Sequence, residues 1–406
     1  MIRYENFDVV AIPSLTTVDK IQLDRIQSVT PVATLNREKN KEVGRDGTID
    51  YVKRTPTIAY ALTQNESLNM KIFRALANKS NSTHPININD FKTSATDLLA
   101  YLTKDDGNFL GTIWYPKLRV AGFSLNIADP DAKIERRFDL VGEVMKEFQN
   151  NNKYVIYKLE TADSGEITGA DWSITLNDPV PVEDPKTSGK YIFRVTRIRG
   201  GVTTDLSAGT GTDQYEYDSG TNVLTVHNAQ VGDSYKIFYT ASSYISGQSI
   251  WTNNDSDVGA TLAYNVSLWL GGQALTRVQG VTVDVRFARE DHKEVGNKEV
   301  VQRGVTEKTV TLTLPRFLET YTIEEILAGK SSGFGHLDIE DYLDNISFVM
   351  KFYSDVAKTQ FKWGIKITNL SPTENRTGVA VDGYTTRDLT LESESMIISD
   401  TESDLA

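Results

Sequence analysis

Few residues in this chain have the types and spacing that chemistry needs. The run GKSSG, Gly329 to Gly333, has the spacing of a G-x-S-x-G nucleophile elbow, which would make Ser331 the nucleophile of a hydrolase. That motif requires a strand before the serine and a helix after it, whereas a helical pattern precedes this one. The run also resembles the end of a phosphate-binding loop, but Glu324 stands where the first glycine of that loop belongs. The end of a helix explains GKSSG better than a catalytic site does.

Metal-binding patterns are also incomplete. The run NNDSDVG, Asn253 to Gly259, alternates oxygen-bearing side chains like a calcium loop, but Tyr264 occupies the place of the bidentate glutamate. The chain has no cysteine, and the carboxylates are too scattered to nominate a catalytic pair. We therefore expect no enzyme, no metal and no cofactor, with a hydrolase based on Ser331 as the enzymatic alternative. The histidines lack the spacing of a zinc site: His84, His227, His292 and His336.

Composition sets broad limits on partners and location. The 406 residues carry a formal charge of −12, and no run rich in lysine or arginine provides the basic face of a tight nucleic-acid binder. The acidity indicates either simple solubility or a surface that faces DNA without gripping it. The first residues, MIRYENFDVV, lack the layout of a signal peptide, and no apolar stretch is long enough for a membrane span. These features predict synthesis in a cytoplasm and no membrane partner.

An internal repeat organises the sequence. The segment from Leu23 to Gly44 aligns without gaps with the segment from Leu275 to Gly296, and half of the positions are identical. The motif LANKS, which begins at Leu76, recurs as LAGKS from Leu327. Because the matched segments follow the same order in both halves, the pattern indicates a duplicated domain. We predict one copy in residues 1–170, a small inserted immunoglobulin-like β-domain in residues 171–247, and a second copy in residues 248–406.

Each copy has the pattern of a β-protein. Apolar and polar residues alternate with period two in VTVDVRF, Val281 to Phe287, and in KLRVAGFSLNI, Lys117 to Ile127. Short helical patterns begin near Asn69 and near Tyr321, and Gly329 suits the end of the second helix. We predict a mainly β fold, with a β-sandwich or barrel and one short flanking helix in each copy. In the inserted domain we predict strands over Tyr191–Arg197, Asn222–His227 and Ser234–Ala241.

A long charged segment lies between the two leading strands of each copy. Its charges, and not only its apolar residues, match between the copies, which is unusual for a loop that contacts nothing. A solvated hairpin tip is the simpler alternative. We predict an intersubunit contact formed by the charges that the copies share: Arg37, Glu38, Lys41 and Glu42, with Arg289, Glu290, Lys293 and Glu294.

The run from Val281 to Gly329 resembles the tail tube proteins of long, non-contractile bacteriophage tails. In that family a β-sandwich with a long loop and a short helix polymerises, and some members fuse two tube domains or carry an added immunoglobulin-like domain. The resemblance covers the two outer regions and implies that three chains form a pseudo-sixfold ring. It also implies that stacked rings make a conduit for DNA in the tail of a virion. An inserted domain between the copies departs from the expected C-terminal position.

The resemblance implies further assignments. The repeated charged loops would stack one ring on the next, and acidic side chains of strands would face the lumen, with Glu135, Asp139 and Glu143 as candidates. Partners would be other copies of the chain, the tape measure, tail terminator and distal tail proteins, and DNA in passage. Assembly would take place in the host cytoplasm. The alternatives are an adhesin-type bacterial surface protein built of tandem sandwiches, or another tail component such as a distal tail or sheath-like protein.

Overall fold

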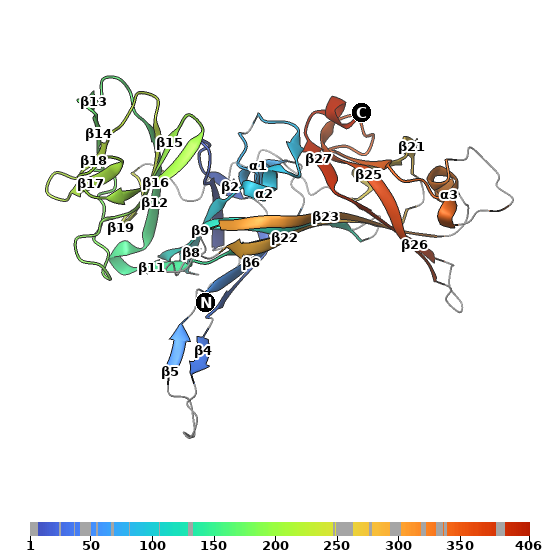
Figure 1. Ribbon diagram of the computed structural model, residues 1–406, viewed down its shortest axis with the longest axis horizontal. Helices are drawn as coiled ribbons and strands as arrows, with labels where there is room; N and C mark the ends of the chain where they lie inside the picture. The colour runs from blue at the N-terminus through green and yellow to red at the C-terminus, as the bar shows by residue number, and fades with distance from the viewer. Residues whose placement is uncertain are drawn as a thin grey trace. The chain divides into compact units, whose positions relative to one another are not determined.

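The structure is a computed structural model of the whole chain (Figure 1). It describes residues 7–23, 26–35, 37–40, 50–53, 56–65, 69–80, 82–104, 106–128, 133–246, 248, 263–275, 278–292, 302–317, 322–329, 336, 339–378 and 386–406. Antiparallel strands make up most of this part of the chain, and its α-helices are short. The predicted mainly β fold is confirmed. Within the described residues, none of the helices has the length and apolar character needed to cross a bilayer.

Contacts group the chain into two compact units that interleave along the sequence. Unit 1 comprises Met1–Leu23, Ala95–Leu118 and Val144–Asn254, and unit 2 comprises Asp24–Ser94, Arg119–Glu143 and Asp255–Ala406. The division falls within the first predicted copy. These units are defined by contacts in the fold and not by the internal sequence repeat, so the predicted repeat boundaries stay a prediction.

Unit 1 contains two groups of strands. In the first group, β1 pairs with β2 and β8, and β9 pairs with β8 and β11. Strand β9 belongs to unit 1 up to Leu118 and to unit 2 from Arg119. The bounds are β1 Phe7–Pro13, β2 Ile21–Leu23, β8 Thr96–Thr103, β9 Phe109–Ile127 and β11 Lys146–Gln149. The second is a sheet in the order β12-β19-β15-β16-β17-β18-β14-β13. Its bounds are β12 Tyr154–Thr161, β13 Ile167–Thr168, β14 Asp171–Thr175, β15 Ile192–Arg199, β16 Val202–Ala208, β17 Gln214–Asp218, β18 Val223–His227 and β19 Ser234–Ala241. All its ladders are antiparallel except the short one between β16 and β17.

The eight-stranded sheet of unit 1 encloses its own core. Trp172 stacks on Tyr235 with ring centroids 4.6 Å apart, and both side chains are buried. The three strands predicted for the inserted domain correspond to β15, β18 and β19. The sheet also includes β12, which starts at Tyr154, before the predicted start of that domain at residue 171. The sequence analysis did not assign β12 to the inserted domain, because its pattern of apolar and polar residues does not differ from that of the strands before it.

Unit 2 is built around eight strands in the order β3-β6-β10-β9-β22-β23-β26-β25. The bounds beyond those already given are β3 Ile26–Thr34, β6 Thr57–Asn65, β10 Glu135–Gly142, β22 Val281–His292, β23 Gln302–Phe317, β25 Phe361–Gly378 and β26 Thr386–Ser393. We call this run the long sheet. Burial alternates along β6 and β10, so one face of the long sheet packs on the core and the other meets solvent.

Further strands and short helices complete unit 2. β20 pairs with β21 and β24, and β25 pairs with β24 and, through its first half, with β27, which in turn pairs with β7. The short strands β4 and β5 form a separate hairpin. The bounds are β4 Arg37–Asn40, β5 Asp50–Lys53, β7 Ile86–Asn87, β20 Val266–Leu270, β21 Gln273–Ala274, β24 Ile346–Tyr353 and β27 Ser395–Ser399. The helices are α1 Lys71–Leu76, α2 Asp90–Thr93 and α3 Thr322–Leu327, and single 3-10 turns cover Asn150–Asn152 in unit 1 and Ala263–Asn265, Ile339–Asp341 and Glu402–Leu405 in unit 2.

The strand registers repeat between the halves of the sequence. Thr30 lies opposite Ala61 in the β3–β6 ladder, and Thr282 lies opposite Thr313 in the β22–β23 ladder. The sequence distance from Thr30 to Thr282 equals that from Ala61 to Thr313, so the two ladders have the same register. The ladders of β9 with β10 and of β25 with β26 agree in the same way, including an irregularity at the same place. The irregularities of β8–β9 also recur in β24–β25.

Backbone details repeat as well. Lys117 and Asn369 stand at matching positions of β9 and β25, and both have a positive φ, 54° and 57°. After the short helices, Asn78 and Gly329 also share a positive φ, as the predicted helix end at Gly329 requires. Ile323, Ile326 and Leu327 of α3 are buried as their spacing predicts. The repeat inferred from sequence is therefore a repeat of strand order and register.

Candidate assembly interface between the two repeats

The two repeats are joined through a β-ladder inside unit 2. Strand β9 of the first repeat pairs antiparallel with β22 of the second, from Val281 opposite Ile127 to Arg286 opposite Gly122. The Thr282 hydroxyl lies 3.1 Å from Oδ1 of Asn126 across this ladder. We call this ladder the seam. It joins four strands of the first repeat and four strands of the second into one continuous sheet.

Glycine occupies both ends of the seam because the backbones approach closely there. A Cβ atom on Gly122 would lie 2.6 Å from the carbonyl oxygen of Val285, and one on Gly280 would lie 2.7 Å from that of Ile127. These distances are shorter than van der Waals contact permits, so any larger residue would push the strands apart. The seam is therefore fitted to its sequence.

One arginine reaches across the seam to the other repeat. From β22, Nε of Arg289 donates to the Val120 carbonyl at 2.6 Å, and its terminal nitrogens donate to the carbonyls of Lys92 and Phe91 at 3.0 and 2.9 Å. A planar guanidinium can satisfy three carbonyls at once because its donors point in fixed directions. Two residues earlier, Phe287 packs against Phe91 with ring centroids 6.3 Å apart. We call this combination the arginine clasp.

Helix α1 of the first repeat also packs against the second. Phe73 lies 5.6 Å from the ring of Trp363 on β25, and the Arg136 guanidinium lies 5.4 Å from the Phe73 ring and 5.5 Å from the Trp363 ring. All three side chains are buried. A cation held between aromatic faces in a desolvated place is stabilised by their quadrupoles. Phe73 also packs on Phe123 and Phe138 of its own repeat, so α1 is held by both repeats.

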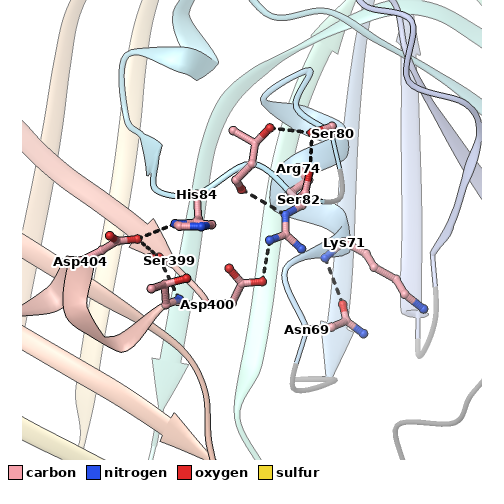
Figure 2. Close-up of polar contacts among 11 residues, drawn as sticks. Asn69, Lys71, Arg74, Ser80, Ser82, His84, Ser399, Asp400 and Asp404 are labelled. Carbon is pink, nitrogen blue, oxygen red and sulfur yellow. Dashed lines mark hydrogen bonds and ion pairs between the residues drawn. The ribbon is translucent and has the colours of Figure 1, made fainter.

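Polar contacts follow the same boundary (Figure 2). Arg74 of α1 forms an ion pair of 2.5 Å with Asp400, and Nδ1 of His84 lies 3.0 Å from Oδ2 of Asp404. The Ser399 hydroxyl donates to the same Asp404 oxygen, which lowers the pKa of that carboxyl below its usual value, with the contact to His84 acting in the same direction. These contacts fix α1 and the segment after it to the C-terminal end of the chain.

The strands at the two ends of the long sheet, β3 and β25, are the counterparts of the two strands that pair in the seam, β22 and β9. By the repeated register, β3 matches β22 and the second half of β25 matches β9. β3 is largely exposed, and the residues of β25 from Ser371 to Thr377 are exposed or half-buried. Val32 and Leu35 are 51% and 64% exposed, whereas Phe287, the counterpart of Leu35, is 4% exposed. Among the described residues, therefore, one pair of edges is joined and no strand lies against the matching pair.

The predicted charged-loop residues meet different outcomes. Arg289 lies in β22 and forms the clasp, and Glu290 follows it with an exposed side chain. Arg37 and Glu38 lie in β4, opposite Lys53 and Val52, and Arg37 is exposed. The contact predicted between subunits stays a prediction. The remaining four residues, Lys41, Glu42, Lys293 and Glu294, lie outside the described part of the chain.

The predicted lumen acids lie on or beside β10. Glu135 and Asp139 share the solvent-facing side of that strand, opposite buried Phe138, and Asp139 pairs with Arg137 at 3.1 Å. Glu143 follows the end of β10 and is half-buried. Which of them faces a lumen stays a prediction.

Among the described residues, no three histidine or carboxylate side chains come close enough together to hold a metal ion. The candidate residues Ser331 and Asn253–Gly259 lie outside the described part of the chain. The sequence did not predict the clasp or the seam. The identity of Arg37 with Arg289 was the one signal for the clasp.

No protein-family model matches the sequence, and a search of curated proteins gives no match. Among solved structures, the chain is similar in part to the baseplate of the anti-feeding prophage, with 12% identity, 36% of this chain and 93% of the other covered, and a TM-score of 0.27. It is also similar to the sheath–tube complex of an extracellular contractile injection system, with 14% identity, coverages of 38% and 100%, and a TM-score of 0.28. A third similar structure is the tube-terminating cap of the anti-feeding prophage, with 11% identity, 39% of this chain and 100% of the other covered, and a TM-score of 0.28. Similarity this low identifies neither a family nor a function.

Proposed function

We propose that this chain is a structural protein of a phage-type tail, which polymerises into the tube that conducts DNA and catalyses no reaction. One observation carries the proposal: in the part of the chain that the structure describes, the two repeats are joined edge to edge and the two equivalent edges are open. An exposed strand edge invites pairing with another chain, and a closed ring removes every such edge. Its site of action would be the tail of a virion.

The repeated register defines how neighbouring chains would pair. In the seam, Ser124 lies opposite Asp284. The matching residues at the open edges are Arg376 of β25 and Val32 of β3. We therefore propose that β25 of one chain pairs antiparallel with β3 of the next, with Arg376 opposite Val32. Three chains, each supplying two repeats, would close a pseudo-sixfold ring, and rings would stack into a tube.

The solvent-facing side of the long sheet suits the wall of a DNA conduit. It carries small and acidic residues, and its arginines Arg137 and Arg286 are paired with Asp139 and Asp284. The small and acidic residues are Ser124, Asn126, Glu135, Asp139, Asp284, Thr311, Thr313, Thr390 and Glu392. A wall of this kind offers few cations to phosphates, so DNA would pass without being held. We propose this face as the lumen, with tape measure, terminator and distal tail proteins as the other partners of the tube.

Cysteine cross-linking tests the pairing, since the chain has no cysteine of its own. A chain with Val32→Cys and Arg376→Cys should form disulfide-linked oligomers under mild oxidation, up to a closed trimer on a non-reducing gel. Ser124→Cys with Asp284→Cys, the equivalent pair in the seam, is the matched control and should form a disulfide within one chain. Negative-stain electron microscopy of the oxidised protein should show rings or tubes.

A pair shifted along one strand provides the control for register. Val32→Cys with Glu374→Cys should link neighbouring chains poorly, because the two positions would not lie opposite each other. Efficient linking of this shifted pair, or a purely monomeric product from the matched pair at high protein concentration, would contradict the proposed assembly.

A further inference from the structure

The arginine clasp of the seam has a counterpart at the open edge. Arg37 pairs with Lys53 in the β4–β5 ladder, and Arg289 pairs with Val305 in the β22–β23 ladder, so the two arginines hold the same register position. Leu35 precedes Arg37 by two residues, as Phe287 precedes Arg289. Both Leu35 and Arg37 are exposed.

The surface that accepts the clasp also recurs in the second repeat. In the first repeat, Phe91 packs on Phe123 of β9 with centroids 5.4 Å apart. In the second, the Tyr342 hydroxyl accepts a 2.9 Å hydrogen bond from Asn375, which matches Phe123 in β25. Tyr342 therefore stands where Phe91 stands, and the next residue, Leu343, matches Lys92.

Exposure distinguishes the two acceptor surfaces. Phe91 is fully buried under Phe287, whereas its counterpart Tyr342 is only half-buried. Lys92 is half-buried, and its counterpart Leu343 is 47% exposed. Val32 of β3, Leu35 beside it and Leu343 beside Tyr342 are exposed large apolar side chains that a neighbouring chain would cover. The carbonyl that matches Val120 belongs to Pro372, which also lies at the open edge of β25.

We infer that Leu35 and Arg37 of one chain form this clasp on a second copy of the chain. The Arg37 guanidinium donates to the carbonyls of Tyr342, Leu343 and Pro372, and Leu35 packs over Tyr342 and Leu343. This inference rests on the proposed ring. It assigns Arg37 to the contact between neighbours within a ring, rather than to the stacking of rings that the family resemblance implies.

Arg37→Ala tests the inference, with Lys186→Ala as a control that removes an exposed cation from unit 1. Sedimentation velocity over a concentration series measures oligomer formation, and calorimetry measures the melting temperature of the chain. We expect Arg37→Ala to raise the concentration for half-maximal assembly at least about tenfold, because several charge-assisted hydrogen bonds are lost. Its monomer should melt like the wild type, since the side chain is exposed.

Further variants separate the clasp from a general charge effect. Arg37→Lys should not restore assembly, because an ammonium cannot direct donors to three separate carbonyls. Leu35→Ser should weaken assembly without changing the melting temperature. Arg289→Ala should instead lower the melting temperature of the monomer, because its clasp lies inside the chain.

The outcomes distinguish this inference from the proposed function. If Val32→Cys with Arg376→Cys links chains and Arg37→Ala assembles like the wild type, the clasp between chains is wrong and the ring stands. If the wild type forms no oligomers and that cysteine pair links no chains, both are wrong. Weakened assembly by Arg37→Lys and Arg37→Ala, with Lys186→Ala unaffected, supports both.

Discussion

The joined seam and the open edges have the same register but different residues. At the two ends of the seam, Gly280 and Gly122 allow the backbones to approach closely. The matching positions at the open edges are Ser28 in β3 and Glu374 in β25. A side chain at these positions prevents an approach as close as in the seam. The contact within the chain is therefore tighter than the one we propose between chains.

This difference has a physical consequence. The seam forms within one polypeptide, where the two strands are held at high effective concentration. The open edges would meet only by collision of separate molecules, and β3 adds Pro31, which has no N–H to donate. An edge that pairs less readily suits a subunit that must stay soluble before it assembles.

The short helices show a second contrast between the repeats. In α1, Phe73 packs against Trp363 of the other repeat. The matching residue of α3 is Glu324, which is buried and forms ion pairs with Arg316 and, at 2.6 Å, with Arg387. At this position α1 therefore contacts both repeats, since Phe73 also packs on Phe123 and Phe138, whereas α3 forms ion pairs within its own repeat.

The largest effect is expected at this buried ion cluster. Glu324→Ala leaves the buried Arg316 and the half-buried Arg387 without their shared carboxylate, so we expect a loss of about 4 kcal/mol in the free energy of unfolding. Denaturant unfolding monitored by circular dichroism measures it, with exposed Glu340→Ala as the control. A loss no greater than that of the control would show that α3 does not rely on this cluster.

A smaller effect is expected at the end of the seam. Gly122→Val should destabilise the chain by about 2–3 kcal/mol, because the new side chain meets the Val285 carbonyl. Glu374→Val, at the matching open position, should change monomer stability by less than about 0.5 kcal/mol. Equal effects of the two substitutions in urea titrations would remove the distinction between the joined and the open edges.

The smallest effect concerns the contact between His84, in the segment after α1, and Asp404, and it depends on pH. The pKa of Asp404 is lower in the folded chain than its ordinary value of 3.8, so its carboxylate stabilises the fold above that value. This contribution is lost as the pH falls through the folded pKa. Asp404→Asn should therefore cost less than about 1 kcal/mol at pH 7 and nothing in strong acid. Melting temperatures at both pH values measure this, and a cost that persists in acid would exclude a role for the charge.

The repeat, the strand character and the helix end at Gly329 can all be predicted from the sequence, because each depends only on residues that are close together along the chain. Alternating residues such as those of Val281–Phe287 fix which face of a strand is buried, and Gly329 ends α3 through its own backbone freedom. The matched charges of Arg37 and Arg289 also identified a position of importance, although not its partner.

The tertiary structure decided which strands meet. Pairing of β9 with β22, and packing of Phe73 on Trp363, join residues that are distant along the chain. The pattern of each strand is satisfied equally by any neighbour of suitable register, so no local rule selects one. The choice of partner depends on which strands the connecting loops can bring together and on the close backbone approach that Gly122 and Gly280 permit. With β9 paired to β22, β3 and β25 lie at the ends of the long sheet.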